Sequence, residues 1–253
     1  MEHITSRQNA LMTHIRKLNA SRAYRRASGE YLCDGVKLLE EALRWNAPLK
    51  TVVLSEGVDA PALPSGVRAV RVPADVMRSI SPMETPQGAL FTVRLPDTAL
   101  PETLSGAHYL VLDGVQDPGN VGTILRTLDA AGFDGCILTP GCADPFAPKT
   151  MRATMGSLFR VPMTFVEDGA EAAHWLRTNG WAVIGAELRG QPFYQRGTRP
   201  DKLCVLIGNE GAGLTEEILA QCSFRYKLPM RGGAESLNAG IAAAVMMYDL
   251  MNR

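Results

Sequence analysis

Residues 107–253 alternate between short apolar runs and amphipathic segments. The strand-like runs are 109–112, 135–138, 181–185 and 203–207, and the helix-like segments are 121–131, 170–179, 215–221 and 236–251. Such alternation implies a mostly parallel sheet with helices on both faces, because parallel neighbours need a crossover between them. Ligands of open sheets of this kind bind beyond the carboxyl ends of the strands. We therefore expect an α/β domain whose chemistry lies in the loops that follow its strands.

Residues 1–93 have the pattern of a smaller α/β unit. Helical periodicity covers 4–26 and 34–45, and strand-like runs occupy 50–55, 67–72 and 87–93. Residues 94–106 hold two prolines and show no clear period, which is typical of a linker. The sequence thus predicts domains at 1–93 and 107–253, joined by a linker at 94–106.

The overall composition is that of a soluble globular protein. Hydrophobic residues make up 46% and charged residues 21%, and the formal net charge is zero, so no global field indicates a nucleic-acid partner. The charge is uneven, however. Residues 1–29 contain one acidic side chain and six basic ones: Arg7, Arg16, Lys17, Arg22, Arg25 and Arg26. A basic patch of this kind suits a phosphate-bearing partner such as RNA, although a solvated helix face would have the same composition.

The cysteine and histidine content bears on the cellular location of the protein and on metal binding. The five cysteines are odd in number, form no C-x-x-C pair and lie mostly in apolar runs, which is typical of reduced, buried thiols in a cytosolic protein. The four histidines show no metal-ligand spacing. No apolar run has membrane-spanning length, and no apolar segment of a secretory signal follows the N-terminus. We expect a cytoplasmic protein with no metal site and no membrane partner.

The segment 109–138 delivers polar residues to the start of a helix. An apolar run is followed by a turn-rich stretch, 113–120, and then by the helical pattern of 121–131. Asn120, Gly122 and Arg126 lie at the turn and on the first helical turns, where backbone N–H groups can hold a polar ligand. An ordinary strand-to-helix corner with a surface arginine is the alternative, since such corners are common in α/β folds.

A glycine-rich turn follows the strand at 203–207. Gly208, Gly211 and Gly213 would let backbone amides approach a ligand closely, and Thr215 is a candidate N-cap for the next helix. The glycine order is not that of dinucleotide folds or phosphate loops, and Glu210 would repel a pyrophosphate. The turn therefore suits a neutral or cationic ligand, unless it is a tight turn without any ligand.

The third constellation spans 226–244. A short strand ends at 228–230, a loop follows at 231–233, and Ser236 and Asn238 open an alanine-rich helix. Ser236 would also serve as an N-cap, whereas Asn238 is a poor residue for a helix interior. If the three loops meet, they form one glycine-lined pocket surrounded by Asn120, Arg126, Glu210, Ser236 and Asn238.

Together these segments resemble the three motifs of the SpoU/TrmH RNA ribose methyltransferases of the SPOUT superfamily. The matching patterns are N-x-G-x-x-x-R-T at 120–127, G-N-E-G-x-G-L at 208–214, and L-P-M at 228–230 with S-L-N-x-x-x-A-A-A at 236–244. Residues 148–157 resemble the family's intermediate segment, and 1–93 resembles its L30e-like substrate-binding domain. One departure is Ala239-Gly240-Ile241, where the family often has Val-Ser-Val.

The resemblance implies a fold, a cofactor and an assembly. The fold would be α/β with a deep C-terminal trefoil knot, and two copies would pair through the C-terminal domain. S-adenosyl-L-methionine would methylate a ribose 2′-hydroxyl of RNA without a metal. The cofactor would contact Gly208, Leu228, Met230, Leu237, Thr139 and Ala186. Methyl transfer would occur among Asn120, Arg126, Glu210, Ser236 and Asn238.

Arg126 is the family's proposed activator of the hydroxyl. Neutralising a guanidinium near pH 7 costs roughly 7 kcal/mol, so we favour a role in clamping the adjacent phosphate and stabilising the developing alkoxide. A separate N-terminal binding domain with a basic arm favours ribosomal RNA over tRNA. Two other functions fit the same resemblance: a non-catalytic RNA-binding or ribosome-associated protein that retains the fold, and a methyltransferase that acts on an RNA base.

Overall fold

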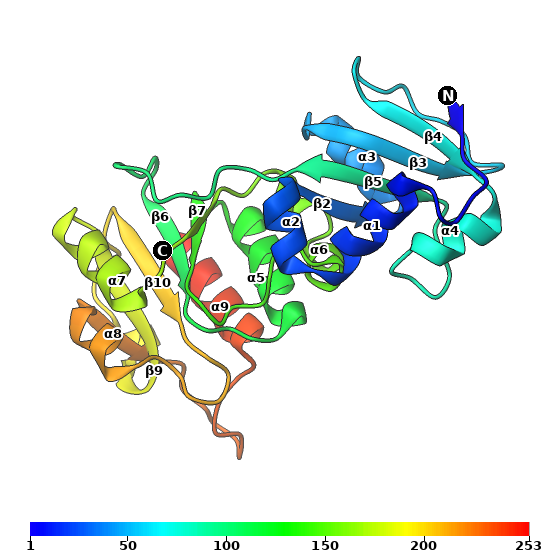
Figure 1. The fold of residues 1–253 in the computed structure, drawn as a ribbon. Helices are drawn as coiled ribbons and strands as arrows, with labels where there is room; N and C mark the ends of the chain where they lie inside the picture. The colour runs from blue at the N-terminus through cyan, green and yellow to red at the C-terminus, as the bar shows by residue number, and fades with distance from the viewer. Residues whose placement is uncertain (253) are drawn as a thin grey trace. The chain divides into compact units, whose positions relative to one another are not determined.

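The computed structural model of the protein describes residues 1–252, which divide into two compact units. Unit 1 consists of Met1–Pro96 together with Asp144–Phe159, and unit 2 consists of Asp97–Ala143 together with Arg160–Arg253. Each unit is built around its own β-sheet (Figure 1).

Unit 2 holds a six-stranded sheet in the order β11-β9-β10-β6-β7-β8, and every paired neighbour in it is parallel. Its strands are β6 (His108–Leu112), β7 (Gly135–Leu138), β8 (Met163–Phe165), β9 (Ala182–Pro192), β10 (Leu203–Ile207) and β11 (Phe224–Lys227). β7 and β10 are buried along their whole length, as is β6 from Tyr109 to Leu112, which is expected for a parallel sheet covered on both faces. The predicted parallel α/β architecture is confirmed.

Helices cover both faces of this sheet. Figure 1 shows α7 (Gly169–Thr178) and α8 (Glu216–Gln221) on one face, with α5 (Pro118–Ala131) and α9 (Ala239–Met251) on the other. Alternate residues of each strand serve the two layers. Val111 and Leu206, for example, pack with Leu176 and Ile218 beneath α7 and α8. A short 3-10 turn, η2 (Phe193–Gln195), follows β9.

Unit 1 holds a mixed five-stranded sheet in the order β1-β4-β3-β5-β2. Its strands are β1 (Glu2–His3), β2 (Glu30–Asp34), β3 (Leu49–Ser55), β4 (Arg68–Val72) and β5 (Ala89–Arg94). β4 runs parallel to both β1 and β3, whereas β5 is antiparallel to β2 and β3. The helices are α1 (Ala10–Ala20), α2 (Arg22–Ser28), α3 (Val36–Arg44) and α4 (Ala74–Ile80).

Residues 144–159 return to unit 1 from the second half of the sequence. They form α6 (Pro148–Thr154) and the 3-10 turn η1 (Ser157–Phe159), and α6 packs against β2. The Phe146 ring lies 5.0 Å from the Tyr31 ring, centroid to centroid. Asp144 accepts a hydrogen bond of 2.6 Å from the buried guanidinium of Arg25. Apolar packing and a buried ion pair therefore join segments that are far apart in the sequence.

The N-terminal region differs from the single helix expected at 4–26. The structure has β1 and two helices, with a break at Ser21, whose extended backbone and side chain cap α2. Asn9 caps α1 in the same way. Helical periodicity alone missed these boundaries because Ser and Asn side chains compete locally for backbone N–H groups. The sequence pattern also did not predict β2, α4 and β8.

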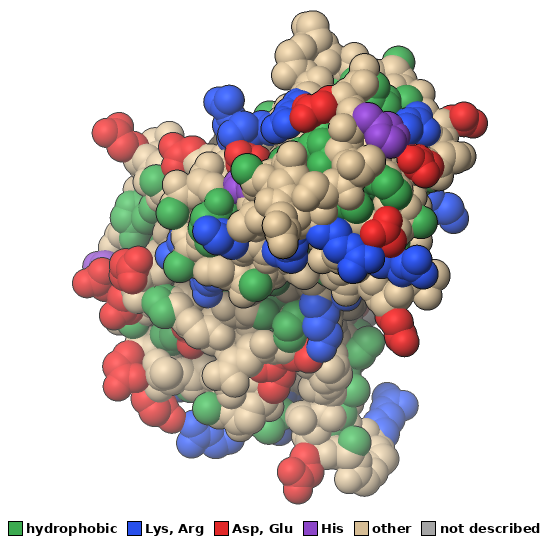
Figure 2. All heavy atoms as spheres, turned by 45° about the vertical axis from the view of Figure 1, so that its right-hand side comes forward, with side chains coloured by type: hydrophobic (Ala, Val, Ile, Leu, Met, Phe, Trp, Pro, Cys, Tyr) green, Lys and Arg blue, Asp and Glu red, His purple; other side chains and the backbone are tan. Residues whose placement is uncertain are grey.

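The charges divide unequally between the units. Unit 1 has 15 Lys and Arg against 10 Asp and Glu, a net charge of +5, and unit 2 has 11 against 16, a net charge of −5. Figure 2 shows Lys and Arg side chains across the face that it draws, with Asp and Glu side chains among and around them. The overall neutrality of the chain thus conceals a basic unit and an acidic unit.

The five cysteines are free, and four of them are buried. Burial raises the pKa of the Cys222 thiol to about 11 and raises the pKa values of Cys136 and Cys204 well above their usual range. These thiols stay protonated near neutral pH, so they are poor nucleophiles. Among residues 1–252, no helix is both long and apolar enough to cross a membrane.

Candidate functional site

Three loops meet at the carboxyl edge of the unit 2 sheet, as the sequence predicted. One links β6 to α5, one follows β10, and one links β11 to α9. β6 and β10 are adjacent parallel strands in register from Leu203 opposite His108 to Ile207 opposite Leu112, so their following loops emerge side by side. α5 and α9 pack against each other, which brings the third loop to the same place.

The loop after β10 closes on its own backbone at Gly208. A Cβ added there would lie 2.3 Å from the carbonyl carbon of Gly213, a distance that no real side chain tolerates. Two backbone hydrogen bonds between Asn209 and Gly213 fold the loop, and Gly213 has a φ of +72°. The first and third glycines are therefore required by the shape of the loop.

Asn209 was not singled out from the sequence, although it shapes this loop more than any other side chain. Its Oδ1 accepts hydrogen bonds from the backbone N–H groups of Gly211 and Ala212, both at 3.0 Å. Its Nδ2 donates to the carbonyl oxygen of Gly114 at 2.8 Å, which fastens the loop to the one after β6. Asn side chains often accept a hydrogen bond from the backbone N–H two residues later in the chain. This tendency is the sequence signal that would have pointed to Asn209.

Glu210 reaches from the glycine loop to the N-terminal end of α5. Its carboxylate accepts hydrogen bonds from the backbone N–H groups of Gln116 (3.0 Å) and Asp117 (3.1 Å), and from Nδ2 of Asn120 (2.9 Å). Partial burial raises the pKa of this carboxyl, but the donors outweigh it, and the pKa is lowered overall. Glu210 is therefore held as a carboxylate where the helix dipole also favours negative charge.

Asn120 and Asn238 extend this contact across to α9. Oδ1 of Asn120 accepts a hydrogen bond of 2.8 Å from Nδ2 of Asn238. Oδ1 of Asn238 in turn accepts from the backbone N–H groups of Gly240 (2.9 Å) and Ile241 (3.3 Å), so it caps α9. Because each amide has one donor side and one acceptor side, this chain of bonds fixes the orientation of both amides. We call it the amide relay: Glu210, Asn120 and Asn238.

The last helix starts later than the predicted residue 236. The helix begins at Ala239, with Asn238 as its N-cap, so neither Ser236 nor Asn238 lies inside it. Ser236 is exposed and has no hydrogen-bond partner within the described chain. Gly240 fits the crowding at this end, because a Cβ there would lie 3.1 Å from Oδ1 of Asn238. The predicted N-cap at Thr215, by contrast, is confirmed, since its hydroxyl accepts from the N–H of Ile218.

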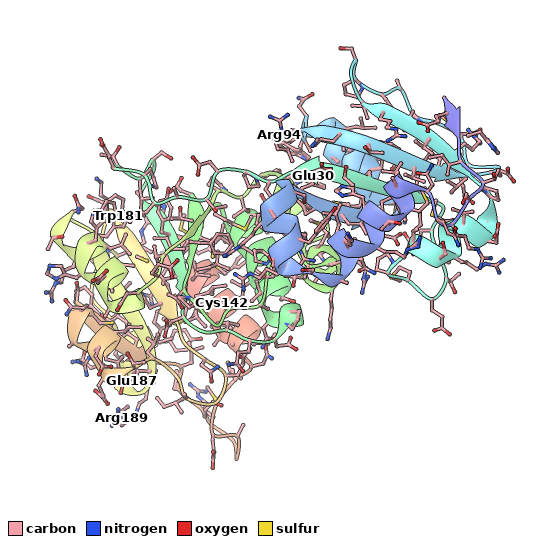
Figure 3. The ribbon with its side chains drawn as sticks, in the orientation of Figure 1. Glu30, Arg94, Cys142, Trp181, Glu187 and Arg189 are labelled. Carbon is pink, nitrogen blue, oxygen red and sulfur yellow. The ribbon has the colours of Figure 1, made fainter. Side chains whose placement is uncertain are left out.

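A cavity of about 470 Å³ lies beside the relay, within the size range of small-molecule sites. Its lining includes five of the six residues predicted to contact the cofactor: Ala186, Gly208, Leu228, Met230 and Leu237. Glu210, Ser236 and Asn238 also face it. Glu187 and Arg189, labelled in Figure 3, lie on β9 and line the same cavity. The lining thus combines glycine-loop backbone, apolar side chains and a few polar groups.

Three predicted residues lie outside this lining: Asn120, which takes part in the amide relay, and Thr139 and Arg126. Thr139 is buried, and its hydroxyl donates to Asp113 at 2.7 Å and accepts from the N–H of Gly114 at 3.1 Å, so it supports the loop after β6. Arg126 is exposed on α5, about 9 Å along the helix axis from Asn120. It has no hydrogen bond or ion pair within residues 1–252. Its guanidinium is therefore available to a ligand that approaches α5 from solvent.

The six basic residues of the N-terminal region have different surroundings. Arg25 is 4% exposed and bonded to Asp144, which assigns it to the stability of unit 1. Arg7 is exposed and pairs with Asp75 at 2.8 Å, and Arg16 donates to the carbonyl oxygen of Arg7. Lys17 lies 5.4 Å from the Tyr24 ring centroid. Arg22 is partly exposed and Arg26 exposed, both on α2.

Solved structures similar to this chain include methyltransferases with bound AdoMet. A crystal structure of an AdoMet-bound rRNA methyltransferase from Sinorhizobium meliloti matches with a TM-score of 0.86 and 29% identity, over 98% of this chain and 97% of that one. The SpoU methyltransferase AviRb from Streptomyces viridochromogenes, in complex with the cofactor AdoMet, matches with a TM-score of 0.82 and 27% identity, over 96% and 97%. The fold and site therefore define the class of RNA methyltransferases.

Sequence comparison narrows the class to a family. Residues 107–248 match the SpoU rRNA Methylase family, and residues 9–90 match the MRM3-like substrate binding domain. The 23S rRNA (guanosine(2553)-2′-O)-methyltransferase RlmP of Bacillus subtilis is 32% identical over 257 residues, covering 99% of each chain. This chain belongs to the SpoU rRNA methylase family, and the resemblance read from its three motifs is confirmed.

Proposed function

We propose that this protein transfers a methyl group from S-adenosyl-L-methionine to a ribose 2′-hydroxyl of ribosomal RNA. The observation that carries the proposal is the amide relay, which joins the three motif segments on the rim of a cavity of cofactor size. Among relatives of similar length, RlmP of Bacillus subtilis bears the name of a 23S rRNA 2′-O-methyltransferase. Ribosomal RNA is therefore the first substrate to test, and tRNA the second.

The cavity suits S-adenosyl-L-methionine in size and polarity. Its lining offers the backbone of the glycine loop for polar groups and Leu228, Met230 and Leu237 for apolar ones. Its charged side chains are balanced, with Arg189 and Lys227 against Glu187 and Glu210, so the cavity does not demand an anionic ligand and is compatible with a cofactor that carries a sulfonium. Bound there, the cofactor would supply the methyl group. Thr139 would act indirectly, by holding the loop after β6.

The residues around the transfer point have distinct roles in this proposal. Glu210 and Asn120 fix the start of α5, and Asn238 fixes the start of α9, so together they hold the cavity rim rigid. Ser236, which is exposed on the rim, contacts the incoming ribose. Arg126 clamps the adjacent phosphate and stabilises the developing alkoxide, which matches its exposure and its lack of partners in the described chain. Placement of these groups can contribute several kcal/mol to catalysis.

The role of Arg126 can be tested by Arg126→Lys. A clamp keeps measurable activity in the lysine variant because the positive charge remains, and the loss should lie mainly in RNA affinity. Methyl incorporation and RNA binding would be measured in parallel. Near-complete loss of activity at normal RNA affinity would contradict the clamp.

Unit 1 is the proposed RNA-binding domain, with the L30e-like fold that its resemblance implies. Its net charge of +5 and its match to a substrate-binding domain support this assignment. Arg7, Arg16, Lys17, Arg22 and Arg26 are its candidate RNA contacts, whereas Arg25 is structural. A cytoplasmic location is consistent with this substrate and with free cysteines.

Two further properties are proposed for unit 2: a C-terminal trefoil knot and a homodimer. The return of α9 to pack on both α5 and β10 supports the knot. An exposed apolar stripe on α9 supports the dimer, because Ile241 is 50% and Tyr248 45% exposed, one above the other at helical spacing. Light scattering of the purified protein tests the dimer, and a monomer at micromolar concentration would contradict it.

Calorimetric titration with S-adenosyl-L-methionine is the first test of the enzyme proposal. Saturable binding to the intact protein is expected. Absence of binding at millimolar cofactor would overturn the proposal and favour a non-catalytic RNA-binding protein of the same fold. Detection of 2′-O-methylated nucleotides in digested product RNA would exclude methylation of a base.

A further inference from the structure

Unit 2 carries a second hollow on the α7 side of its sheet. This hollow, which we call the α7 groove, has a volume of about 770 Å³ and shares no lining residue with the cofactor cavity. Its apolar lining includes Leu100, Val166, Ala170 and Trp175. Leu100 is 37% exposed, so an apolar surface is open to solvent there. Surface hollows of this kind commonly mark interaction sites.

The floor of the α7 groove is rigid. Trp175 stacks on Trp181, with ring centroids 6.3 Å apart and planes 23° from parallel. Figure 3 labels Trp181 close to α7, and the ammonium of Lys202 lies 4.7 Å from its ring centroid. Val166, Ala170 and Trp175 also pack against the buried core beneath α7. A ligand that inserts an apolar side chain would therefore meet a preformed surface.

The rim of the α7 groove is acidic. Glu167, Asp168 and Glu171 line it, and its lining contains no lysine or arginine. Asp168 is engaged as the N-cap of α7, where it accepts from the N–H groups of Ala170 and Glu171. Glu167 and Glu171 are exposed and pair with no cation in the part of the chain that the structure describes. Figure 2 shows acidic side chains gathered along its left edge, the side on which Figure 1 places α7 and α8.

We propose that the α7 groove docks a basic segment of another protein, which inserts a large apolar side chain between lysine or arginine contacts. The unpaired carboxylates and the net charge of −5 of unit 2 are complementary to such a segment. The same charges repel RNA phosphates. This inference goes beyond the proposed methylation and does not depend on it.

The test uses the full-length protein and a short fluorescein-labelled peptide of alternating lysine and leucine. Fluorescence anisotropy measures its Kd, and a lysine–alanine peptide of equal length is the control for the apolar anchor. We expect the leucine peptide to bind at least about tenfold more tightly, because each buried leucine adds apolar area. Equal affinity for the two peptides would overturn the apolar part of the proposal.

Two matched variants locate the site. Glu171→Gln removes a rim carboxylate and should weaken the leucine peptide about two- to fivefold. Asp201→Asn removes an exposed carboxylate of the same unit outside the groove and should leave the Kd unchanged. Leu100→Ala should weaken binding without lowering the thermal midpoint. Equal effects of Glu171→Gln and Asp201→Asn would mean non-specific attraction and would overturn the proposal.

Competition separates the alternative occupants. A ribosomal RNA fragment should not displace the peptide, and Glu171→Gln should change neither the oligomeric state nor methylation. Displacement by RNA would assign the groove to nucleic acid, and a change in oligomeric state would assign it to a second copy of this chain. Either result would contradict the proposed protein partner.

Discussion

At the scale of single residues, the site depends on side chains that satisfy backbone groups. Glu210 binds the free N–H groups before α5, and Asn238 binds those of α9, while Asn120 links the two. Helix ends leave such N–H groups without internal partners, so side chains from other loops can be fixed there. The contacts that satisfy N–H groups at the N-terminal ends of α5 and α9 therefore also align the three loops of the site.

Asn238 combines a capping role with a place in the relay, and two substitutions separate them. Asn238→Ser keeps a hydroxyl that can cap α9 but loses the amide that donates to Asn120. We expect its stability within about 0.5 kcal/mol of the natural protein, whereas Asn238→Ala should lose about 1 kcal/mol. Methyl transfer should fall in both. Full activity in Asn238→Ser, measured by methyl incorporation, would show that the relay is dispensable.

The lowered pKa of the Glu210 carboxyl predicts that the stability of the protein depends on pH. Its folded pKa is lowered from 4.5, so its stabilising contribution is complete above that value and is lost as the pH falls through the lowered pKa. Glu210→Gln should cost about 1 kcal/mol at neutral pH, because an amide N–H then faces a backbone donor. The difference in the free energy of unfolding between the natural protein and Glu210→Gln should narrow as the pH falls below 4.5 and through the lowered pKa. A difference that is constant with pH would contradict the account.

At the scale of elements, the tight closure of the glycine loop predicts how glycine substitutions change cofactor affinity. Gly208→Ala places a Cβ 2.3 Å from the backbone of Gly213, so the loop must open and cofactor affinity should fall by at least about tenfold. Gly211→Ala is the matched control, because its Cβ would lie 3.6 Å from Oδ1 of Asn209, an ordinary contact. Calorimetric titration compares the two variants. Equal affinity in Gly208→Ala and Gly211→Ala would mean that loop closure does not form the cofactor site.

Much of unit 2 could be predicted from sequence because its strands are buried on both faces and its loops carry distinctive polar residues. The strand at 203–207 and the helix ending at 131 were found at the observed positions. The exact start of α9 could not be predicted, because choosing between Ser236 and Asn238 as cap depends on Asn120, 118 residues away. Likewise, nothing local to Arg25 indicates its burial against Asp144.

At the scale of the whole molecule, residues 144–159 complete the core of unit 1. The Arg25–Asp144 pair links them to α2, and its two side chains are only 5% and 11% exposed. Arg25→Ala would leave the carboxylate buried without its cation, and we expect a loss of about 3 kcal/mol or more in the free energy of unfolding. Arg22→Ala, on the same helix, should cost less than about 0.5 kcal/mol. Chemical denaturation measures both, and equal losses would contradict a structural role for Arg25.

The division of charge explains how one neutral chain can serve an RNA substrate. In the proposed function, the basic unit 1 attracts phosphates, while the acidic unit 2 presents its cavity and the exposed Arg126. Binding and chemistry are thus assigned to different parts of the chain. The family membership agrees with this division, since separate models match the two regions.

The central claim is tested most directly by mapping ribose methylation. Ribosomal RNA from cells that lack the gene would be incubated with the purified protein and S-adenosyl-L-methionine, then digested and analysed by mass spectrometry. The account predicts a new 2′-O-methylated nucleotide, absent without the cofactor and strongly reduced with Asn120→Ala. Methylation of a base, or no methylation of ribosomal RNA or tRNA by a protein that binds the cofactor, would contradict it.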